Sequence, residues 1–222
     1  MTHHHHKFLL LGLAVVLPAC GQWSNAQGVT TTIAPTTTTT VAERGISESG
    51  QRSGPSTMAA QKKLLQLGFW LHNPNGTFDD TTRQAVMAFQ KWTGLTATSV
   101  VDATTAAFLN TTQCKPVAGR TTGDFFEVDK VKQIAFVVRD GKVVYTFNVS
   151  TGNGKDYDEE DQRSGGRVTG VAITPSGDFK IYKERDEKVY EGNLGSLYRP
   201  KFVVGGIAVH GSRSIPAYPA SH

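Results

Sequence analysis

VKQIAFVVRDGKVVYTFNVSTG, residues 131–152, decides the fold of the second half of this chain. β-branched and aromatic residues recur with a strand-like period on both sides of Asp140-Gly141. This pattern is typical of half-buried strands, and an Asp-Gly pair between two such runs is a strong signal for a two-residue hairpin turn. The stretch therefore predicts an antiparallel β-hairpin.

Further strand patterns follow this hairpin along the chain. VTGVAITPSGDFKIYKE, residues 168–184, predicts a strand, a Pro-Ser-Gly turn and another strand. KFVVGGIAVHG, residues 201–211, predicts one more strand. The charged and glycine-rich residues 155–166 are expected to form a solvated surface loop. We therefore expect a β-rich domain over residues 125–222.

Upstream, the apolar residues recur at helical rather than strand spacing. Amphipathic helices are expected in three segments, TMAAQKKLLQLGFW (57–70), TTRQAVMAFQKWTG (81–94) and DATTAAFLN (102–110). Gly68 and Gly94 stand where the first two helices should end. Asp80 or Thr81 is expected to cap the second helix, and Asp102 the third. Three short helices joined by tight loops predict a small bundle over residues 57–112.

The motifs of this bundle stand in a recognisable order: LLQLGFW (64–70), NGTFDDTTRQAVMAFQKWTGL (75–95) and VDATTAAFL (101–109). Together they resemble the peptidoglycan-binding domain found in many bacterial cell-wall enzymes. Most of the apolar positions would serve a three-helix core in any protein, so the ordered set within one short span carries the resemblance. The resemblance implies peptidoglycan as a partner, with Trp70, Asn75 and Phe78 as candidate binding residues.

The N-terminal residues predict export. FLLLGLAVVL, residues 8–17, is an apolar run too short to span a membrane as a helix and is typical of a signal peptide. LPAC, residues 17–20, resembles a bacterial lipobox, which implies lipidation of Cys20 and anchoring to the outer face of the cytoplasmic membrane. Pro18 departs from the commonest lipobox pattern, and a plain signal peptide over residues 1–20 is the alternative.

Two segments are expected to be linkers. Residues 21–56 are dominated by Thr, Ser, Gly and Pro without an apolar period, so they predict a disordered tether. Residues 113–124 predict a second, shorter linker. Cys114 lies in this linker and is given no catalytic role. If Cys20 is acylated, Cys114 has no partner inside the chain, because the sequence has 2 cysteines.

The charge pattern of the chain does not indicate a polyanionic partner. The formal net charge is +4, and the basic residues are scattered along the chain. Because no block of Lys and Arg is present, we expect no nucleic-acid partner. No metal or organic cofactor is implied, and we expect a monomer.

The β-rich half carries motifs of its own: DGKVVYTFNVSTG (140–152), TPSGDFKIY (174–182), IAVHGS (207–212) and PASH (219–222). These resemble the L,D-transpeptidase catalytic domain, the YkuD-type fold. In that family a His-Gly pair is followed, after a proline-containing loop, by Ser-His-Gly-Cys. His210-Gly211 and Ser221-His222 match the two pairs, and the cysteine nucleophile is expected to be absent from this chain, which ends at His222.

The resemblance implies roles for these residues in acyl transfer between peptides, which needs a nucleophile, a base and oxyanion donors. His210 would be the general base, oriented by the backbone carbonyl of Gly211. Ser221 and His222 would line the substrate cleft and shape the nucleophile loop. Without a nucleophile, the chain as given is expected to be inactive.

These histidines also fit three other kinds of site or role. His210 with Ser212 or Ser221 suggests a serine hydrolase, but no Gly-x-Ser-x-Gly elbow is present. His210 and His222 with His72 suggest a zinc site, but no HExxH or CxxC spacing supports it. A histidine that only ends a strand is the simplest alternative, and the flanking motifs argue against it.

The sequence as a whole predicts an α+β protein of the cell envelope. A three-helix peptidoglycan-binding bundle is followed by a mostly β, YkuD-like domain that is expected to be incomplete at its C-terminus. The implied function is L,D-transpeptidation of peptidoglycan stem peptides, which serves cell-wall biogenesis and cell shape. The alternative is a non-catalytic peptidoglycan-binding lipoprotein whose enzyme domain is a relic.

Overall fold

The computed structural model describes residues 45–212 and 214–220. The expected signal peptide, Cys20, most of the expected tether, Ser221 and His222 lie outside these residues. Three helices come first along the described chain and nine strands follow. An α+β fold class, with a helical N-terminal region and a mostly β remainder, is thereby confirmed.

The three helices form where the sequence predicts them. They are α1 (Pro55–Gln66), α2 (Asp80–Thr93) and α3 (Ala103–Thr111). Gly68 (φ 87°) and Gly94 (φ 78°) adopt the left-handed conformation just past α1 and α2, which glycine accepts without a steric penalty. Asp102 caps α3 by accepting a hydrogen bond from the Thr105 amide at 2.7 Å, as expected.

The cap of α2 is neither residue proposed from the sequence: it lies one residue before Asp80 and two before Thr81. Asp79 is the N-cap, and its carboxylate accepts hydrogen bonds from the Thr82 amide at 2.8 Å and from the Thr81 hydroxyl at 2.9 Å. Burial opposes the ionised form, yet these hydrogen bonds hold the pKa of Asp79 below its ordinary value. Asp79 makes the better cap because its backbone is extended, as an N-cap requires, whereas Asp80 already belongs to the helix.

The hairpin predicted at residues 131–152 is present as two of three antiparallel strands. These are β1 (Phe125–Asp129), β2 (Ile134–Arg139) and β3 (Lys142–Asn148), in the order β1-β2-β3. Arg139 pairs with Lys142 across the turn, and both turn residues have positive φ, 47° for Asp140 and 71° for Gly141. These angles fit the tight turn that Asp-Gly favours. A register shift between Val137 and Val138 bends the pair.

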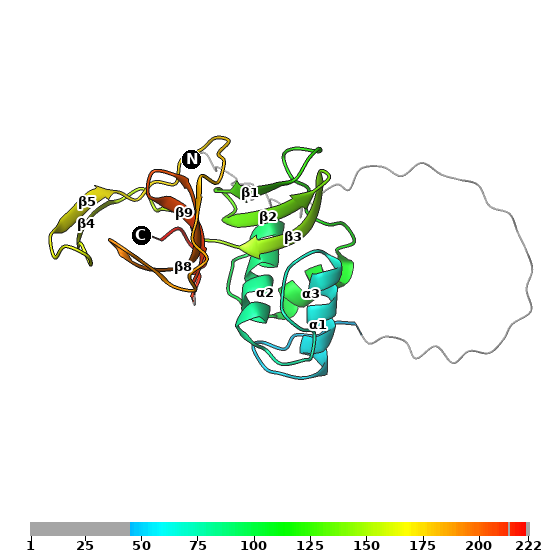
Figure 1. Ribbon diagram of the computed structural model, residues 1–222. Coiled ribbons are helices and arrows are strands. Elements are labelled where there is room, and N and C mark those ends of the chain that lie inside the picture. Colours follow the sequence, from blue (N-terminus) through cyan, green and yellow to red (C-terminus); the bar gives the residue numbers. More distant parts are fainter. Residues whose placement is uncertain (1–44, 213, 221–222) are drawn as a thin grey trace, which may run out of the picture. The chain divides into compact units, whose positions relative to one another are not determined.

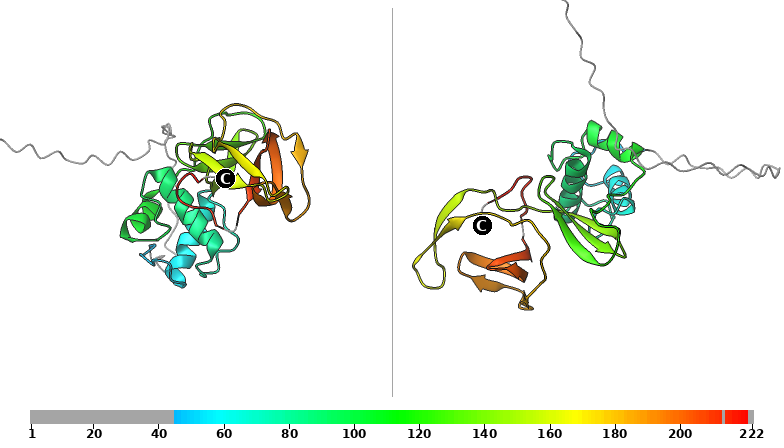
Figure 2. Two further views of the ribbon diagram at one scale, coloured as in Figure 1. Left: turned by 90° about the vertical axis from the view of Figure 1, so that its left-hand side faces the viewer. Right: turned by 90° about the horizontal axis from the view of Figure 1, so that it is seen from above.

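The helices pack on one face of this sheet (Figures 1 and 2). Phe69 and Phe89 from the helical region and Ile134 from β2 are fully buried in the same cluster, and Phe69 meets Phe89 edge to face at 5.5 Å. Backbone hydrogen bonds cross the same boundary, from the Trp70 amide to the Thr146 carbonyl and from the Thr146 amide to the Gly68 carbonyl. The helices and the β1-β2-β3 sheet therefore share one hydrophobic core.

The rest of the described chain forms shorter, more exposed strands. They are β4 (Asp156–Glu160), β5 (Arg167–Val171), β6 (Lys183–Glu184), β7 (Tyr190–Gly192), β8 (Gly195–Val204) and β9 (Ile207–Gly211). β4 pairs with β5, while β8 pairs with β6, β7 and β9, all antiparallel.

Three expectations for this region were wrong. Residues 155–166 contain strand β4 rather than only a loop, because this segment pairs with β5 in a hairpin; the segment is exposed to solvent as expected. The strand expected to end at Glu184 is reduced to the two residues of β6. The single strand expected over residues 201–211 is a hairpin instead, because Gly205-Gly206 provides a turn between β8 and β9.

Candidate active site

His210 lies on β9, one residue before its end. The β8–β9 pairing brings Gly211 opposite Tyr198, and register shifts in β8 accompany the positive φ of Arg199 (46°). The Nδ1 atom of His210 lies 3.0 Å from the Gly211 carbonyl oxygen, within hydrogen-bond distance. If Nδ1 donates in this contact, Nε2 is left as the acceptor, which is the tautomer a general base needs.

The position of Gly211 accepts only a glycine without rearrangement. A Cβ atom added there would lie 2.7 Å from Cδ1 of the Tyr198 ring. The absence of a side chain therefore lets the two strands close beside His210. This packing supports the backbone whose carbonyl meets the imidazole.

The loop that follows β9 is held by hydrogen bonds to the end of β3. The Ser150 hydroxyl donates to the Tyr218 carbonyl at 2.9 Å. The Ala220 amide donates to the Ser150 hydroxyl at 3.0 Å and to the Thr151 carbonyl at 2.9 Å. Sequence reasoning did not identify these residues, although Ser150 and Thr151 lie inside the NVSTG stretch that carried part of the resemblance.

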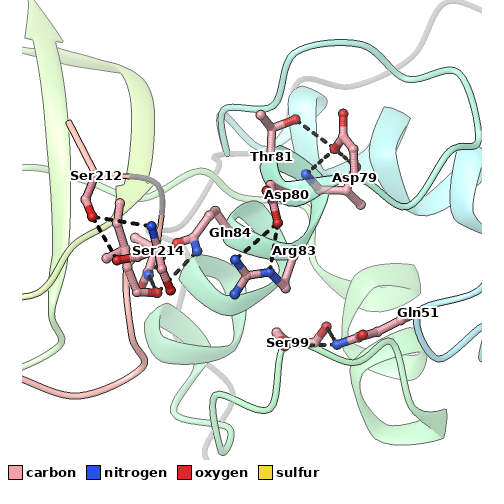
Figure 3. A network of polar contacts seen from close by, with 12 residues as sticks. Gln51, Asp79, Asp80, Thr81, Arg83, Gln84, Ser99, Ser212 and Ser214 are labelled. Carbon is pink, nitrogen blue, oxygen red and sulfur yellow. Dashed lines mark hydrogen bonds and ion pairs between the residues drawn. The ribbon is translucent and has the colours of Figure 1, made fainter. Parts of the chain in front are cut away.

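The serines near His210 are engaged within this loop. The Ser212 hydroxyl donates to the Ser214 carbonyl at 2.9 Å and accepts from the Ser214 amide at 3.3 Å (Figure 3). Ser212 thus stabilises a local turn, and no observation supports it as a nucleophile. Ser221 and His222 lie outside the described residues, so their proposed roles stay predictions.

The described residues contain no group of three or more His, Cys, Asp or Glu side chains placed to hold a metal ion. His72, which was weighed as a third zinc ligand, is an exposed residue before α2; its backbone amide donates to the Thr81 hydroxyl at 3.1 Å.

A groove of about 940 Å³ lies on the helical bundle. It is lined by residues of α1, the loop before α2 and the end of α3, including Met58, Lys62, Lys63, Asn75 and Asn110. The described lining contains two cations and no carboxylate. A groove with this lining suits a ligand that carries carboxylates and amides.

Of the three candidate wall-binding residues, Asn75 lines this groove, and Trp70 and Phe78 do not. Asn75 lines it, and its side-chain oxygen also accepts from the Thr77 amide at 2.8 Å. Phe78 packs against the shared core. Trp70 is 37% exposed and lies 5.6 Å from the Phe147 ring, which in turn meets Tyr145 on β3. Trp70 therefore belongs to an aromatic surface separate from the groove.

A half-buried cation joins α2 to the β1-β2-β3 sheet. Lys91 Nζ donates to the carbonyls of Gln133 at 3.1 Å and Val149 at 3.2 Å. Burial lowers the pKa of Lys91 from its ordinary 10.5 to about 8. No carboxylate offsets this desolvation, because both partners are neutral carbonyls.

Cys114 is disulfide-bonded in this structure, whereas the sequence predicts that it lacks a partner only if Cys20 is acylated. It is the only cysteine among the described residues. Lipidation of Cys20 and a bond between the 2 cysteines of the sequence exclude each other chemically, because both need the same sulfur.

Family models match both halves of the chain. Residues 53–109 match a putative peptidoglycan binding domain, and residues 123–222 match the L,D-transpeptidase catalytic domain. No curated protein matches. Among solved structures, an L,D-transpeptidase from Xylanimonas cellulosilytica is 40% identical with a TM-score of 0.69, over 81% of this chain and 84% of that one.

Two further structures are more distant. An L,D-transpeptidase from Stackebrandtia nassauensis is 17% identical with a TM-score of 0.36, over 78% of this chain and 80% of that one. A fused Zn-dependent amidase/peptidase and peptidoglycan-binding protein from Clostridium acetobutylicum is 15% identical with a TM-score of 0.30, over 75% and 79%. These two carry no further argument. The match to the Xylanimonas cellulosilytica enzyme and the two family models show that this chain belongs to the L,D-transpeptidases that carry a peptidoglycan-binding domain.

Proposed function

We propose that this protein binds peptidoglycan through its helical bundle and transfers acyl groups between stem peptides. The observation that carries the proposal is His210 at the end of β9, with Nδ1 3.0 Å from the Gly211 carbonyl oxygen, inside a chain of this family. In the family pattern a cysteine stands two residues after the position of His222, and such a cysteine would be the nucleophile of the proposed reaction.

The chemistry is a two-step exchange of amide bonds. His210 accepts the thiol proton as the cysteine sulfur attacks a stem-peptide carbonyl, and backbone amides stabilise the oxyanion. The C–N bond breaks, the leaving amine takes the proton, and a thioester remains on the cysteine. An amine of a second stem then attacks the thioester and gives a proton to His210, the C–S bond breaks, and the released thiolate takes that proton back from His210 to regenerate the thiol. No oxidant or reductant is consumed.

The test uses the full product of the reading frame with purified stem peptides as donor and acceptor. Cross-linked dimers, identified by mass spectrometry, are expected from the wild-type protein. They should fall by at least about 100-fold in His210→Gln, because general-base catalysis contributes on the order of 10²–10⁴. His72→Gln is the matched control, since His72 is an exposed histidine on the bundle side. Unchanged cross-linking in His210→Gln would refute the assignment.

The alternative is a peptidoglycan-binding protein without catalysis. It predicts that the wild-type protein cosediments with cell-wall sacculi yet forms neither dimers nor a thioester adduct of a stem peptide. Sequencing the reading frame through the codons after His222 decides which protein must be assayed. A Gly-Cys pair there supports the transferase, and any other continuation supports the binding protein.

For wall binding we propose the groove on the bundle, with Lys62 and Lys63 facing stem-peptide carboxylates. Among the described residues that line the groove there is no Asp or Glu that would repel a stem-peptide carboxylate, and this supports the assignment. Lys62→Gln combined with Lys63→Gln should weaken cosedimentation with sacculi and make the remainder less salt-dependent. Lys132→Gln, an exposed change elsewhere, is the control. If Trp70→Leu weakens binding and the lysine changes do not, the aromatic surface is the binding site instead.

We further propose that the protein is exported and anchored through a lipid on Cys20. The LPAC stretch supports this, and among the described residues no helix is long and apolar enough to cross a membrane. Mass spectrometry of the protein from its host tests the proposal. A peptide beginning at acylated Cys20 is expected. A peptide pair joined through Cys20 and Cys114 contradicts it.

A further inference from the structure

Helix α2 of the bundle reaches the loop that follows the candidate base. The Gln84 side-chain amide donates to the Ile215 carbonyl at 3.2 Å, and its oxygen accepts from the Asn148 amide at 2.6 Å. Figure 3 shows Gln84 extending from α2 toward the segment that bears Ser212 and Ser214. Gln84 thus links the bundle, the end of β3 and the loop.

Asn148 completes this contact from the sheet. It is the last residue of β3 and is 3% exposed. Its Nδ2 lies 3.4 Å from the carbonyl oxygens of both Ile215 and Pro216, while its Oδ1 has no hydrogen-bond partner. A buried amide with an unsatisfied acceptor is costly, and groups of this kind are often retained for a role beyond stability.

The loop held in this way, residues 214–220, connects two parts of the proposed site. His210-Gly211 precede it and Ser221-His222 follow it, with the nucleophile next in the family pattern. Gln84 and Asn148 hold the first part of the loop, and Ser150 and Thr151 hold the last. The distance between base and nucleophile therefore depends on how firmly this loop is held, and a shift of about 1 Å can cost on the order of 100-fold in rate.

We propose that Gln84 is a positioning residue for acyl transfer, acting through the loop 214–220. This inference rests on the proposed function, because it assigns the loop to an acyl-transfer site. It makes the wall-binding bundle a structural part of the catalytic site as well as an anchor. Gln84 touches no reacting atom, so it should affect the rate of the transfer step and leave stem-peptide binding nearly unchanged.

The test compares Gln84→Leu with Arg83→Leu in the full-length protein. Arg83 is the adjacent residue of α2, and its ion-pair partner is Asp80 of the same helix at 3.3 Å. Gln84→Leu should lower kcat about 10- to 100-fold with KM changed less than about threefold. It should also speed hydrogen exchange of the amides within 214–220. Arg83→Leu should change neither.

Two further variants distinguish positioning from general destabilisation. Asn148→Ala should reproduce the loss in kcat, and the double variant Gln84→Leu/Asn148→Ala should lose little more than one single variant, because both act through one contact. Gln84→Glu keeps the oxygen that accepts from Asn148 and loses the amide that donates to the Ile215 carbonyl. If the contact with Asn148 is the one that positions the loop, Gln84→Glu should retain more activity than Gln84→Leu.

The outcomes separate this inference from the proposed function. Wild-type rates and wild-type loop exchange in Gln84→Leu overturn the positioning role. Equal losses in Gln84→Leu and Arg83→Leu overturn it as well, since they indicate a general effect on α2. If the wild-type protein forms no cross-links, the proposed function fails, and faster exchange confined to 214–220 in Gln84→Leu then still shows whether Gln84 holds the loop.

Discussion

Gly211 serves the proposed site in two ways, through its carbonyl and through its missing side chain. Gly211→Ala would bring a Cβ to 2.7 Å from Tyr198 Cδ1, so the strands must separate or the ring must move. Overpacking in a core costs about 1–3 kcal/mol; because Gly211 and Tyr198 are both exposed, we expect the low end of that range, about 1 kcal/mol. We therefore expect a lower free energy of unfolding, measured by urea denaturation, together with loss of the His210 contact to the Gly211 carbonyl.

A control is available in the same hairpin. At Gly206 nothing lies within 4 Å of an added Cβ, so Gly206→Ala should be nearly neutral. Tyr198→Ser in the Gly211→Ala background should restore part of the lost stability, because it removes the ring. If Gly211→Ala is as mild as Gly206→Ala, the close approach to Tyr198 does not constrain position 211.

Lys91 predicts a particular pH dependence of stability. Its pKa is about 8 in the folded protein and near 10.5 in the unfolded chain. Between these values the unfolded state binds more protons, so the free energy of unfolding should rise with pH from about 8 to 10.5. Below pH 8 both states are protonated, and this group adds no slope. Lys91→Met should lose the rise.

Urea denaturation at pH 7, 8, 9 and 10 measures this difference. Lys62→Met is the matched control, because Lys62 is an exposed lysine on the bundle, and it should keep the wild-type slope. Parallel curves for the wild-type protein and Lys91→Met would mean that water reaches Lys91 Nζ and that burial does not lower its pKa.

Sequence reasoning located His210 and Gly211 because a short local motif carries them. It did not identify Gln84, whose partner Ile215 is 131 residues away, because no spacing along the chain encodes a contact of that range. Lys91 was missed for the same reason: at the end of a helix it reads as a solvated lysine, and only the approach of the sheet buries it.

At the scale of elements, α3 depends on its cap. It has 9 residues, too few for an isolated helix to be stable in water. The Asp102 carboxylate accepts a hydrogen bond from the Thr105 amide at 2.7 Å. This hydrogen bond is the main reason why the pKa of Asp102 lies below its ordinary value. Asp102→Ala should destabilise the protein by about 1 kcal/mol in thermal or urea denaturation.

Asp102→Asn tests whether the cap is the cause, because asparagine caps about as well as aspartate. It should cost much less than Asp102→Ala at pH 7. The carboxylate's contribution is present above the unfolded pKa and is lost as the pH falls through the lowered folded pKa. The wild-type protein should therefore lose part of its advantage over Asp102→Ala in acid, whereas the difference between the two uncharged variants should not change through this group. Equal losses in both variants would mean that charge rather than capping stabilises α3.

The elements predicted correctly are those whose local signal has one interpretation. The elements missed are those whose pattern also fits another structure. The hairpin at Asp140-Gly141 and the glycine ends of α1 and α2 follow from backbone preferences of single residues. The turn at Gly205-Gly206 was missed although Gly-Gly is also a hairpin signal, because the apolar run around it reads as one strand. Strand β4 was missed because its charged residues indicate solvent, and an exposed hairpin satisfies that pattern too.

At the scale of the whole molecule, the shared core decides how the protein unfolds. The sequence predicts a bundle and a β domain separated by a linker over residues 113–124. The packing adds what the sequence pattern does not encode. Ile134, Phe136 and Val138 of β2 are buried in one cluster with side chains of all three helices. The helical region and the β1-β2-β3 sheet therefore both contribute side chains to this one core.

The helices and the β1-β2-β3 sheet should therefore unfold together, as expected of elements that share one core. Ile134→Val removes one methyl group from the sheet side and should cost about 1 kcal/mol. The loss should appear equally in hydrogen exchange of α2 and of β2, and in the fluorescence of Trp92, which packs against Phe69 and Phe89 from α2. Val131→Ala, at a residue 95% exposed, should change neither. If Ile134→Val weakens protection in β2 and leaves α2 unchanged, the two parts are independent domains, and the bundle then holds the loop 214–220 only as a docked neighbour.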